Sequence, residues 1–396
     1  MESPSGVPEN MKKSTPRPHV VLSNLGASAD DIRHATRFAA PDPFFVVLPP
    51  DPRQSPVFLL SALEAARAAK ACPRAAVHTP ETLRRALPAK AELPADSAGR
   101  LAAMLGLLGI RRVALPPDFP FAAAETLRRA RIAVESAPKP LFPGRAIKTP
   151  AEIRAIAASQ RTAAAAFRAA AAAVARSTVD PRTRRLLLDG RVLTSERLRA
   201  IIETVFLERG CSAPEGTIAA AGRQAACPHE TGHGPIRAGE AIVLDIFPRD
   251  TATGYWGDLT RTIVKGNPSP ALRALHRTVA AAQRLAFSMI RPGVPRRAVH
   301  QAVVRFFRAA GYPERLEPAD RACGFIHGLG HGIGLSIHES PGLRNDPGNL
   351  RAGEVLSVEP GLYYPAIGGV RIEDLVVVVP GGFRFLAACP RTFVVP

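Results

Sequence analysis

Residues 327–339 read HGLGHGIGLSIHE and hold three of the ten histidines in a chain of 396 residues. Glycine occupies positions 328, 330, 332 and 334 of this segment, and a residue without a Cβ atom lets the backbone approach a site closely. A single histidine on an apolar face usually belongs to a core. Three histidines in one glycine-rich segment instead favour a functional site in this part of the chain.

Four acidic residues accompany this segment, and each lies beside an apolar run that is typical of a buried strand. They are Asp245 after AIVL, Asp258 within YWGDLT, Glu359 after VLSV and Glu373 after GVRI. A carboxylate at such a position costs several kcal/mol unless it is paired or bound to a metal ion. One acid of this kind could form an ordinary salt bridge, but four within about 130 residues favour a shared site.

These residues form an oxygen-rich set of candidate ligands, four carboxylates and one histidine from residues 327–339. Such a set suits Mn, Co, Fe or Zn rather than a structural zinc site built from thiolates. Two cations about 3.5–4 Å apart would balance the four negative charges and hold a bridging hydroxide. The five cysteines never form a Cys-x-x-Cys pair, which argues against a thiolate site or a disulfide framework and favours a reducing compartment.

Other catalytic motifs are absent from the sequence. His338-Glu339 does not start an H-E-x-x-H motif because position 342 is glycine. The alternating glycines do not make G-x-G-x-x-G, and neither a G-x-x-x-x-G-K-[ST] phosphate loop nor a G-x-S-x-G nucleophile motif occurs. A nucleophilic triad that assembles in space from distant residues stays open at this stage.

The regions around the site predict an α/β protein of two domains preceded by a tail. Residues 1–18 are rich in Pro, Ser and Lys and predict a loose tail. Residues 19–145 alternate short β-like runs with helical runs, which predicts an α/β domain with a largely open sheet. Prolines at 138, 140 and 143 break any element there, and residues 146–396 form the second α/β domain.

Individual elements follow from local patterns. Thr149-Pro150-Ala151-Glu152 combines a capping threonine, a proline at the first helical position and a capping-box glutamate, so a helix starts here and runs to about Arg176. Further helices are expected at residues 62–71, 122–131, 193–209, 270–291 and 294–310. Strands are expected at residues 20–22, 44–48, 57–60, 113–115, 241–244, 260–264, 355–358, 370–372 and 375–379.

The chain carries 52 Lys and Arg against 34 Asp and Glu, a formal net charge of +18. This excess first suggests an anionic partner, but only seven of the basic residues are Lys, the arginines are scattered, and aromatic residues make up 6%. The pattern is typical of compositional bias rather than of a nucleic-acid-binding surface. Neither a run of 18 apolar residues nor the apolar part of a signal peptide occurs, so we expect a cytoplasmic protein that binds neither nucleic acid nor membrane.

The order Asp, Asp, His, Glu, Glu resembles the pita-bread metallopeptidases, which include methionine aminopeptidase, aminopeptidase P and prolidase, with creatinase as a metal-free relative. The resemblance rests on five ordered motifs, at residues 243–245, 257–262, 327–339, 357–361 and 369–374. Residues 19–145 also resemble the creatinase-type N-terminal domain, and residues 145–153 resemble the junction after it. This implies the branch that cleaves Xaa-Pro bonds, since methionine aminopeptidase generally lacks that domain.

The resemblance implies a metal ligand set. Asp245 would chelate one ion. Asp258 and Glu373 would bridge both ions. His331 and Glu359 would complete the other ion.

The resemblance also implies residues that act on the substrate. Glu359 would shuttle a proton as general base and then acid, and His338 would stabilise the developing oxyanion. His327 and His229 would line the substrate site. Arg371, two residues before the last acid on a strand, would face the same side and orient that carboxylate.

The chain departs from the family pattern in two places. Ile246-Phe247-Pro248 follows Asp245 where a small residue is common, which is expected to reshape a pocket wall. His229 and His233 compete for one role, and the preceding Pro228 and the spacing to Asp245 favour His229. His233 is then a loop residue or a peripheral substrate contact.

The function implied by the resemblance is a dinuclear metallopeptidase that hydrolyses Xaa-Pro bonds by a metal-bridging hydroxide. It implies two divalent ions, with Mn favoured over Co, Zn or Fe, a peptide substrate with proline after the scissile bond, and a homodimer. A related hydrolase with another substrate and a non-catalytic pseudo-peptidase that serves as a binding module are the alternatives. The choice between the prolidase and the aminopeptidase P type stays open.

Overall fold

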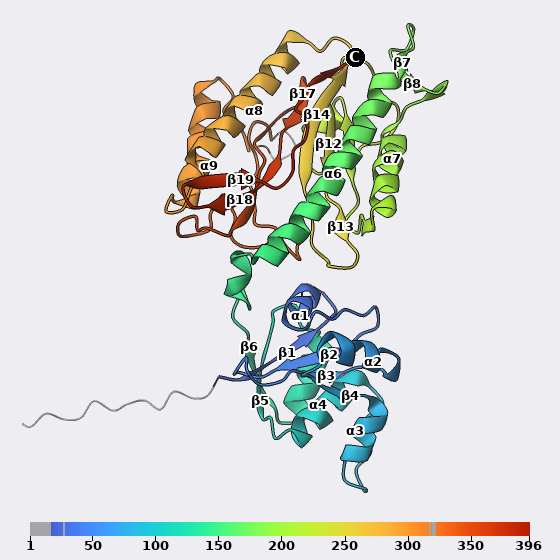
Figure 1. Ribbon diagram of the computed structural model, residues 1–396, viewed down its shortest axis with the longest axis vertical. Helices are drawn as coiled ribbons and strands as arrows, with labels where there is room; N and C mark the ends of the chain where they lie inside the picture. Colours follow the sequence, from blue (N-terminus) through green and yellow to red (C-terminus); the bar gives the residue numbers. More distant parts are fainter. Residues whose placement is uncertain (1–16, 27, 317, 319–321) are drawn as a thin grey trace, which may run out of the picture. The chain divides into compact units, whose positions relative to one another are not determined.

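The computed structural model describes residues 17–26, 28–316, 318 and 322–396. The chain divides into two compact units, Met1–Phe142 and Pro143–Pro396, each with hydrophobic cores of its own (Figure 1). Most of the tail predicted for residues 1–18 lies outside the described residues. Within the described ranges, no helix is both long enough and apolar enough to span a membrane.

The first unit is a mixed α/β fold. Its strands are β1 (His19–Ser23), β2 (Phe45–Leu48), β3 (Val57–Leu59), β4 (Ala76–His78), β5 (Arg112–Leu115) and β6 (Ala133–Ser136). Its helices are α1 (Ser28–Thr36), α2 (Ala62–Ala71), α3 (Pro80–Ala86), α4 (Ser97–Leu107) and α5 (Phe121–Arg129).

The strands of the first unit form one sheet in the order β4-β3-β2-β1-β5-β6. The pairs β1–β2 and β2–β3 are antiparallel, and the other pairs are parallel. Neighbouring side chains of β1 point to opposite faces. Val21 packs in the core with Leu101 and Leu127, whereas Leu22 packs in the core with Ile32 and Ala68. Helices therefore cover the sheet on both faces.

The second unit contains the predicted site. Its helices are η1 (Pro143–Ala146), α6 (Pro150–Arg176), α7 (Ser195–Glu208), η2 (Gln224–Ala226), α8 (Pro270–Met289) and α9 (Arg296–Ala309). Its strands are β7 (Thr178–Val179), β8 (Leu186–Leu188), β9 (Arg191–Val192), β10 (Cys211–Ser212), β11 (Ile218–Ala221), β12 (Ile242–Ile246), β13 (Arg249–Asp250), β14 (Leu259–Lys265), β15 (Val355–Val358), β16 (Gly361–Tyr364), β17 (Gly368–Arg371), β18 (Asp374–Val379), β19 (Gly382–Phe385) and β20 (Val394–Val395).

Helix α6 starts where the capping pattern predicts. The Thr149 hydroxyl accepts from the Glu152 N–H, the Glu152 carboxylate accepts from the Thr149 N–H, and Pro150 occupies the first turn. Alanine favours the helix along most of its length. Its buried residues, among them Phe167 and Val174, face the strands beside it.

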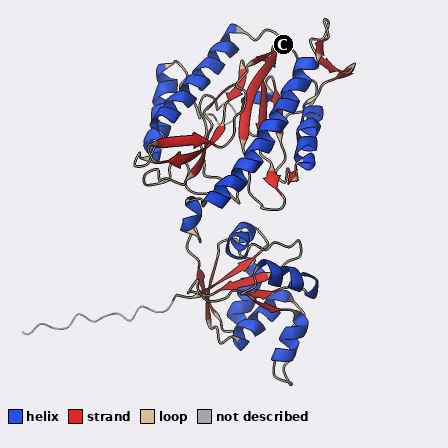
Figure 2. Cartoon of the chain, in the orientation of Figure 1, coloured by secondary structure: helices blue, strands red, loops and turns tan. Residues whose placement is uncertain are grey.

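The central strands of the second unit, among them β12, β14 and β17, lie between two pairs of helices (Figure 1 and Figure 2). Strand β12 shows both faces: Ile242 and Leu244 pack in the core that includes α6 and α7, whereas Val243 packs with α8 and α9. The central sheet runs β11-β12-β14-β20, and the chain after β14 adds the sheets β15-β18-β19 and β16-β17. The arrangement confirms the predicted α/β class.

Strand β12 is longer than its apolar run predicts. It extends to Ile246, so Asp245 lies inside the strand rather than after its end. The reason is pairing on both sides, because Asp245 lies opposite Ile218 of β11 and opposite Thr260 of β14. The β12 backbone therefore fixes the position of this carboxylate.

Candidate metal centre

One cavity of about 440 Å³ in the second unit is lined by every residue predicted for the site. The nine residues are His229, Asp245, Asp258, His327, His331, His338, Glu359, Arg371 and Glu373. Ile218, Phe247 and Ile337 add an apolar part to the wall. His233 does not line this cavity, and its side chain is 72% exposed. Of the two competing histidines, the structure brings only His229 to the site.

Asp258 is held by a buried amide from the long helix. It lies directly before β14, and Gln160 of α6 binds its backbone twice. Gln160 Nε2 donates to the Asp258 carbonyl, and Gln160 Oε1 accepts from the Asp258 N–H, both at 2.7 Å. These two hydrogen bonds fix the backbone from which the carboxylate projects.

The glycine-rich segment runs beside β15. The Ser357 N–H donates to the His331 carbonyl and the Glu359 N–H donates to the Leu329 carbonyl, both at 2.8 Å. A Cβ atom on Gly330 would overlap the carbonyl oxygen of Ser357, so this close approach requires glycine. The segment is thereby pinned with His331 facing the acids.

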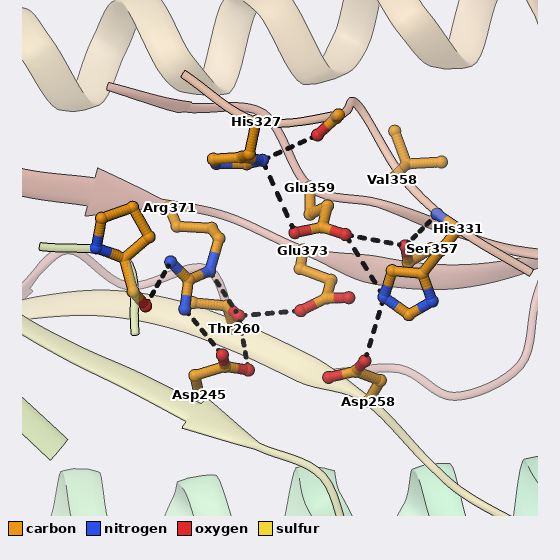
Figure 3. A network of polar contacts seen from close by, with 12 residues as sticks. Asp245, Asp258, Thr260, His327, His331, Ser357, Val358, Glu359, Arg371 and Glu373 are labelled. Carbon is orange, nitrogen blue, oxygen red and sulfur yellow. Dashed lines mark hydrogen bonds and ion pairs between the residues drawn. The ribbon is translucent and has the colours of Figure 1, made fainter. Parts of the chain in front are cut away.

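His331 lies between two carboxylates (Figure 3). Its Nε2 is 3.5 Å from Oδ2 of Asp258 and 3.3 Å from Oε1 of Glu359. One ligand atom each from Asp258, His331 and Glu373 lie within 4.8 Å of one another. Ser357 Oγ accepts from the His331 N–H at 2.9 Å and donates to Glu359 Oε1 at 3.1 Å. The side chains of Asp258, His331 and Glu373 are close enough to bind one ion.

Thr260 joins the other two acids. Its Oγ1 is 2.9 Å from Oδ1 of Asp245 and 2.7 Å from Oε2 of Glu373. Arg371 donates from Nη2 to Asp245 at 2.6 Å and from Nε to the threonine hydroxyl at 3.2 Å. The expected direct partner of Arg371 was Glu373, but its ion pair is with Asp245. It reaches Glu373 only through Thr260, because β17 ends at Arg371 and the alternation along the strand does not continue.

His327 forms a hydrogen-bonded chain with Tyr363 and Arg371. Its Nδ1 is 2.7 Å from the Gly328 carbonyl, which can only accept, so Nδ1 carries the proton. Nε2 then accepts from the Tyr363 hydroxyl at 2.9 Å, and that hydroxyl accepts from Arg371 Nη1 at 2.8 Å. Burial and the charge of Arg371 lower the pKa of His327 to about 3, so the ring is neutral.

His338 stands edge-on to His331, with ring centroids 4.3 Å apart. Burial, followed by the charge of His331, lowers the pKa of His338 to about 4. A neutral imidazole still carries one N–H. This ring can therefore donate one hydrogen bond into the cavity without adding a positive charge.

The two buried acids of the site, Asp258 and Glu373, lack enough positively charged protein partners to favour their ionised forms. Burial raises the pKa of Asp258 to about 7, and burial with the neighbouring carboxylates raises the pKa of Glu373 well above its ordinary value. Burial opposes a charge on His331, but the hydrogen bond to Asp258 and the charge of Glu359 raise its pKa to about 9. Among the described residues, Glu373 Oε1 is buried without a hydrogen-bond partner. An orphaned carboxylate oxygen beside other carboxylates fits a divalent cation.

Four residues that organise the site were not predicted. They are Gln160, Thr260, Ser357 and Tyr363. Thr260 and Ser357 had a usable signal, since each lies two residues from an acid along an extended segment and so shares its face. Gln160 and Tyr363 reach the site from distant parts of the chain, and no local pattern identifies them.

A cavity with these acids and histidines, in this α/β fold, is typical of metallopeptidases. Residues 154–380, more than half of the chain, match metallopeptidase family M24, and the chain belongs to this family. The resemblance to the pita-bread metallopeptidases is thereby confirmed.

Curated relatives match about half of the chain. The Xaa-Pro dipeptidase of Pyrococcus furiosus is 34% identical over 195 residues, which cover 48% of this chain and 53% of that protein. The probable dipeptidase PepE of Mycobacterium tuberculosis is 35% identical over 237 residues, 58% of each chain. The chain thus spans about half the length of the curated relatives it matches.

Solved structures match nearly the whole chain. The X-Pro aminopeptidase of Thermotoga maritima superposes with a TM-score of 0.74 at 23% identity, covering 96% of this chain and 97% of that one. The prolidase of Pyrococcus furiosus superposes with a TM-score of 0.72 at 23% identity, covering 94% and 97%. At this identity the match establishes the fold, and it confirms the predicted pita-bread arrangement.

Proposed function

We propose that the chain is a dinuclear metal-dependent peptidase that hydrolyses the peptide bond before proline. The observation that carries the proposal is the group of carboxylates around His331, with one buried oxygen of Glu373 left without a partner in the described structure. Membership of a metallopeptidase family supports it. So do relatives named Xaa-Pro dipeptidase.

Five residues would hold the metal. Asp245 would bind one ion, Asp258 and Glu373 would bind both, and His331 and Glu359 would complete the second. Two divalent ions bound there would supply Lewis-acid activation of the scissile carbonyl and a hydroxide nucleophile at neutral pH. Manganese remains the favoured ion, on the family resemblance.

The protein's own residues would move the proton and stabilise charge. Glu359, whose pKa is raised first by burial, would take the proton of the attacking water and return it to the proline nitrogen of the leaving group. His338 would donate a hydrogen bond to the oxygen that becomes negative. The neutral His327 and His229 would line the path of the substrate. Ile218, Phe247 and Ile337 offer an apolar wall that suits a proline ring.

The remaining assignments extend the proposal to the whole chain. Residues 19–145 would form a creatinase-like N-terminal domain and residues 146–396 the catalytic domain. A homodimer and a cytoplasmic location are further predictions that the resemblance and the cysteine content support.

The test is hydrolysis of Xaa-Pro dipeptides and of longer Xaa-Pro-Yaa peptides with added Mn²⁺ or Co²⁺. We expect turnover of at least one class, and their relative rates would distinguish the prolidase type from the aminopeptidase P type. No hydrolysis of either, with metal content confirmed, would reject the proposal. Bound metal without Xaa-Pro hydrolysis would favour a related hydrolase, and a chain that binds no divalent ion would favour the binding module.

His331 gives the sharpest variant for this test. His331→Ala should abolish metal loading at one of the two positions, because no other imidazole lies between Asp258 and Glu359 in the described structure. Elemental analysis after dialysis measures the change. Near-normal metal content and activity in this variant would contradict the ligand assignment.

A further inference from the structure

Gln283 lies in the middle of α8, and its side chain is completely buried. The buried residues around it on this helix are apolar, among them Leu275, Val279 and Ala286. A buried amide in such an environment costs free energy unless its polar atoms are hydrogen-bonded. Its hydrogen bonds therefore indicate its role.

The amide nitrogen of Gln283 lies within hydrogen-bond distance of three oxygen atoms, which share its two protons. Its Nε2 lies 3.0 Å from the carbonyl oxygen of Val358, 3.1 Å from that of Ile372 and 3.1 Å from Oδ2 of Asp374. All three atoms are acceptors, so the nitrogen of the amide must face them. Oε1 is buried and finds no partner in the part of the chain that the structure describes. All the hydrogen bonds of this side chain are therefore made by its donor nitrogen.

The two carbonyl groups bound by Gln283 directly precede two proposed metal ligands. Val358 precedes Glu359, and Ile372 precedes Glu373. Figure 3 shows Val358 beside the carboxylate network. One side chain therefore holds the backbone of both ligand-bearing segments.

The two ligands lie in a short gap between two paired stretches. Strands β15 and β18 pair as far as Val358 and Asp374, and pairing resumes at Gly361 and Arg371 of β16 and β17. Within the gap the Ile372 N–H donates to the Pro360 carbonyl at 3.4 Å, whereas the Glu359 N–H donates to the Leu329 carbonyl and the Glu373 N–H to the Thr260 carbonyl. Gln283 adds a side-chain link between the two segments in this gap.

The third acceptor is a fixed anchor. Asp374 Oδ1 accepts from Arg261 at 2.6 Å, and its Oδ2 accepts from Arg391 at 2.6 Å. Asp374 is itself buried. The Gln283 amide, hydrogen-bonded to this carboxylate, has little freedom to shift. It therefore also restricts the movement of the two carbonyl groups that it binds.

We infer that Gln283 is a positioning residue that sets the spacing of Glu359 and Glu373, and through it the affinity of the site for divalent cations. The inference rests on the proposed function, because it requires these carboxylates to bind metal. Gln283 does not line the cavity, so it acts through the backbone of the ligands and not on the substrate.

The test is metal binding by the full chain carrying Gln283→Met, which removes the donor and keeps the side-chain length. Calorimetry with Mn²⁺ or Co²⁺ alone should give a dissociation constant weaker by about tenfold or more than that of the unmodified chain. At saturating metal, KM for an Xaa-Pro dipeptide should change by less than about twofold. Gln283→Glu is a second variant if the first does not fold, because a carboxyl group has at most one proton to offer the three acceptors and should weaken metal binding as well.

Leu275→Ala is the matched control. Leu275 is completely buried on the same helix and in the same core, so the variant should lower Tm strongly and leave the metal dissociation constant within about twofold. Unchanged metal affinity in Gln283→Met would overturn the inference, and so would equal weakening by Leu275→Ala. If the unmodified chain binds no metal, the proposed function fails instead.

Discussion

Thr260 presents a single hydroxyl to two carboxylates and one guanidinium. A hydroxyl carries one proton, so it can donate to only one of Asp245 and Glu373 at a time. It positions both acids but cannot neutralise them. The residue thus keeps the ligand set arranged while leaving its charge for a cation to balance.

Removal of this hydroxyl should weaken metal binding. We expect Thr260→Val, which keeps the shape of the side chain, to weaken the metal dissociation constant by about tenfold. Thr260→Ser keeps the hydroxyl and should stay close to the unmodified chain. Competition with a chelator measures both variants, and equal affinity of the valine variant and the unmodified chain would contradict the role.

Tyr363 should contribute to stability through its hydroxyl. Tyr363→Phe leaves His327 Nε2 and Arg371 Nη1 without this partner in a buried setting, so we expect a loss of about 1–3 kcal/mol in the free energy of unfolding. Tyr364→Phe is the control, since that hydroxyl only reaches the Pro313 carbonyl at 3.4 Å in an exposed position. Urea unfolding compares the two variants. Equal losses would show that the hydrogen bonds of the Tyr363 hydroxyl to His327 and Arg371 do not contribute more to stability than an exposed hydroxyl does.

Helices and strands that depend on residues close in sequence could be predicted, and those that depend on distant neighbours could not. Helix α6 begins at its capping box because Thr149 and Glu152 are close in sequence, and β15 coincides with the apolar run 355–358. Strands β4 and β6 were not predicted, because they are short and only partly buried and depend on neighbours in the sheet.

The same distinction applies to the site. An acid beside an apolar run is visible in the sequence, which is why the four acidic ligand candidates could be named, whereas His331 was named from the family resemblance. The predicted partner of Arg371, Glu373, was wrong. Its ion pair is with Asp245, which lies 126 residues away in the sequence and is not indicated by any local pattern. Gln160 is 98 residues from Asp258, and only the folded chain brings such residues together.

The close contact between the glycine-rich segment and β15 can be tested by a substitution at Gly330. Gly330→Ala should push the segment away from Ser357 and move His331, so we expect metal binding to fall by about tenfold or more. Gly144→Ala is the control, because a Cβ there meets open space. Elemental analysis of both purified variants tests this, and full metal content in Gly330→Ala would contradict it.

At the scale of the molecule, a basic chain holds an acidic cavity. The net charge is +18, yet Arg371 is the only arginine among the residues that line the cavity, against Glu215 and the four acids of the site. The arginine excess therefore lies elsewhere on the chain, and the local field at the site favours cations.

Acid should destabilise the second unit partly through His276. Burial, followed by the charge of Arg261, lowers its pKa from about 6.5 to about 4. Protonation of His276 thus favours the unfolded chain. The contribution of the neutral ring to the free energy of unfolding is complete above pH 6.5 and is lost as the pH falls towards 4. The loss is roughly 3 kcal/mol at most.

His276→Phe should remove that part of the pH dependence. The phenyl ring can keep the stacking on Phe393, whose ring centroid lies 4.0 Å away. Unfolding can be followed by the fluorescence of Trp256, the single tryptophan, at pH 7 and below. Identical pH profiles for the variant and the unmodified chain would rule out this contribution.

The proposed ligands come from separate parts of the second unit, with Asp245 and Asp258 at β12 and β14, and with Glu359 and Glu373 directly after β15 and directly before β18. In an unfolded chain these carboxylates are far apart, so an ion that needs all of them binds the folded form alone. By linkage, such an ion adds about 2.7 kcal/mol to the free energy of unfolding when its free concentration is about 100 times its Kd. We expect Tm to rise with added ion and to fall on chelation, which scanning fluorimetry measures; a Tm indifferent to every ion would contradict the centre. The Tm of the chain then reports how much of the site is occupied by metal. At equal ion concentrations, the order of the Tm shifts for Mn, Co, Fe and Zn would rank their affinities without any substrate.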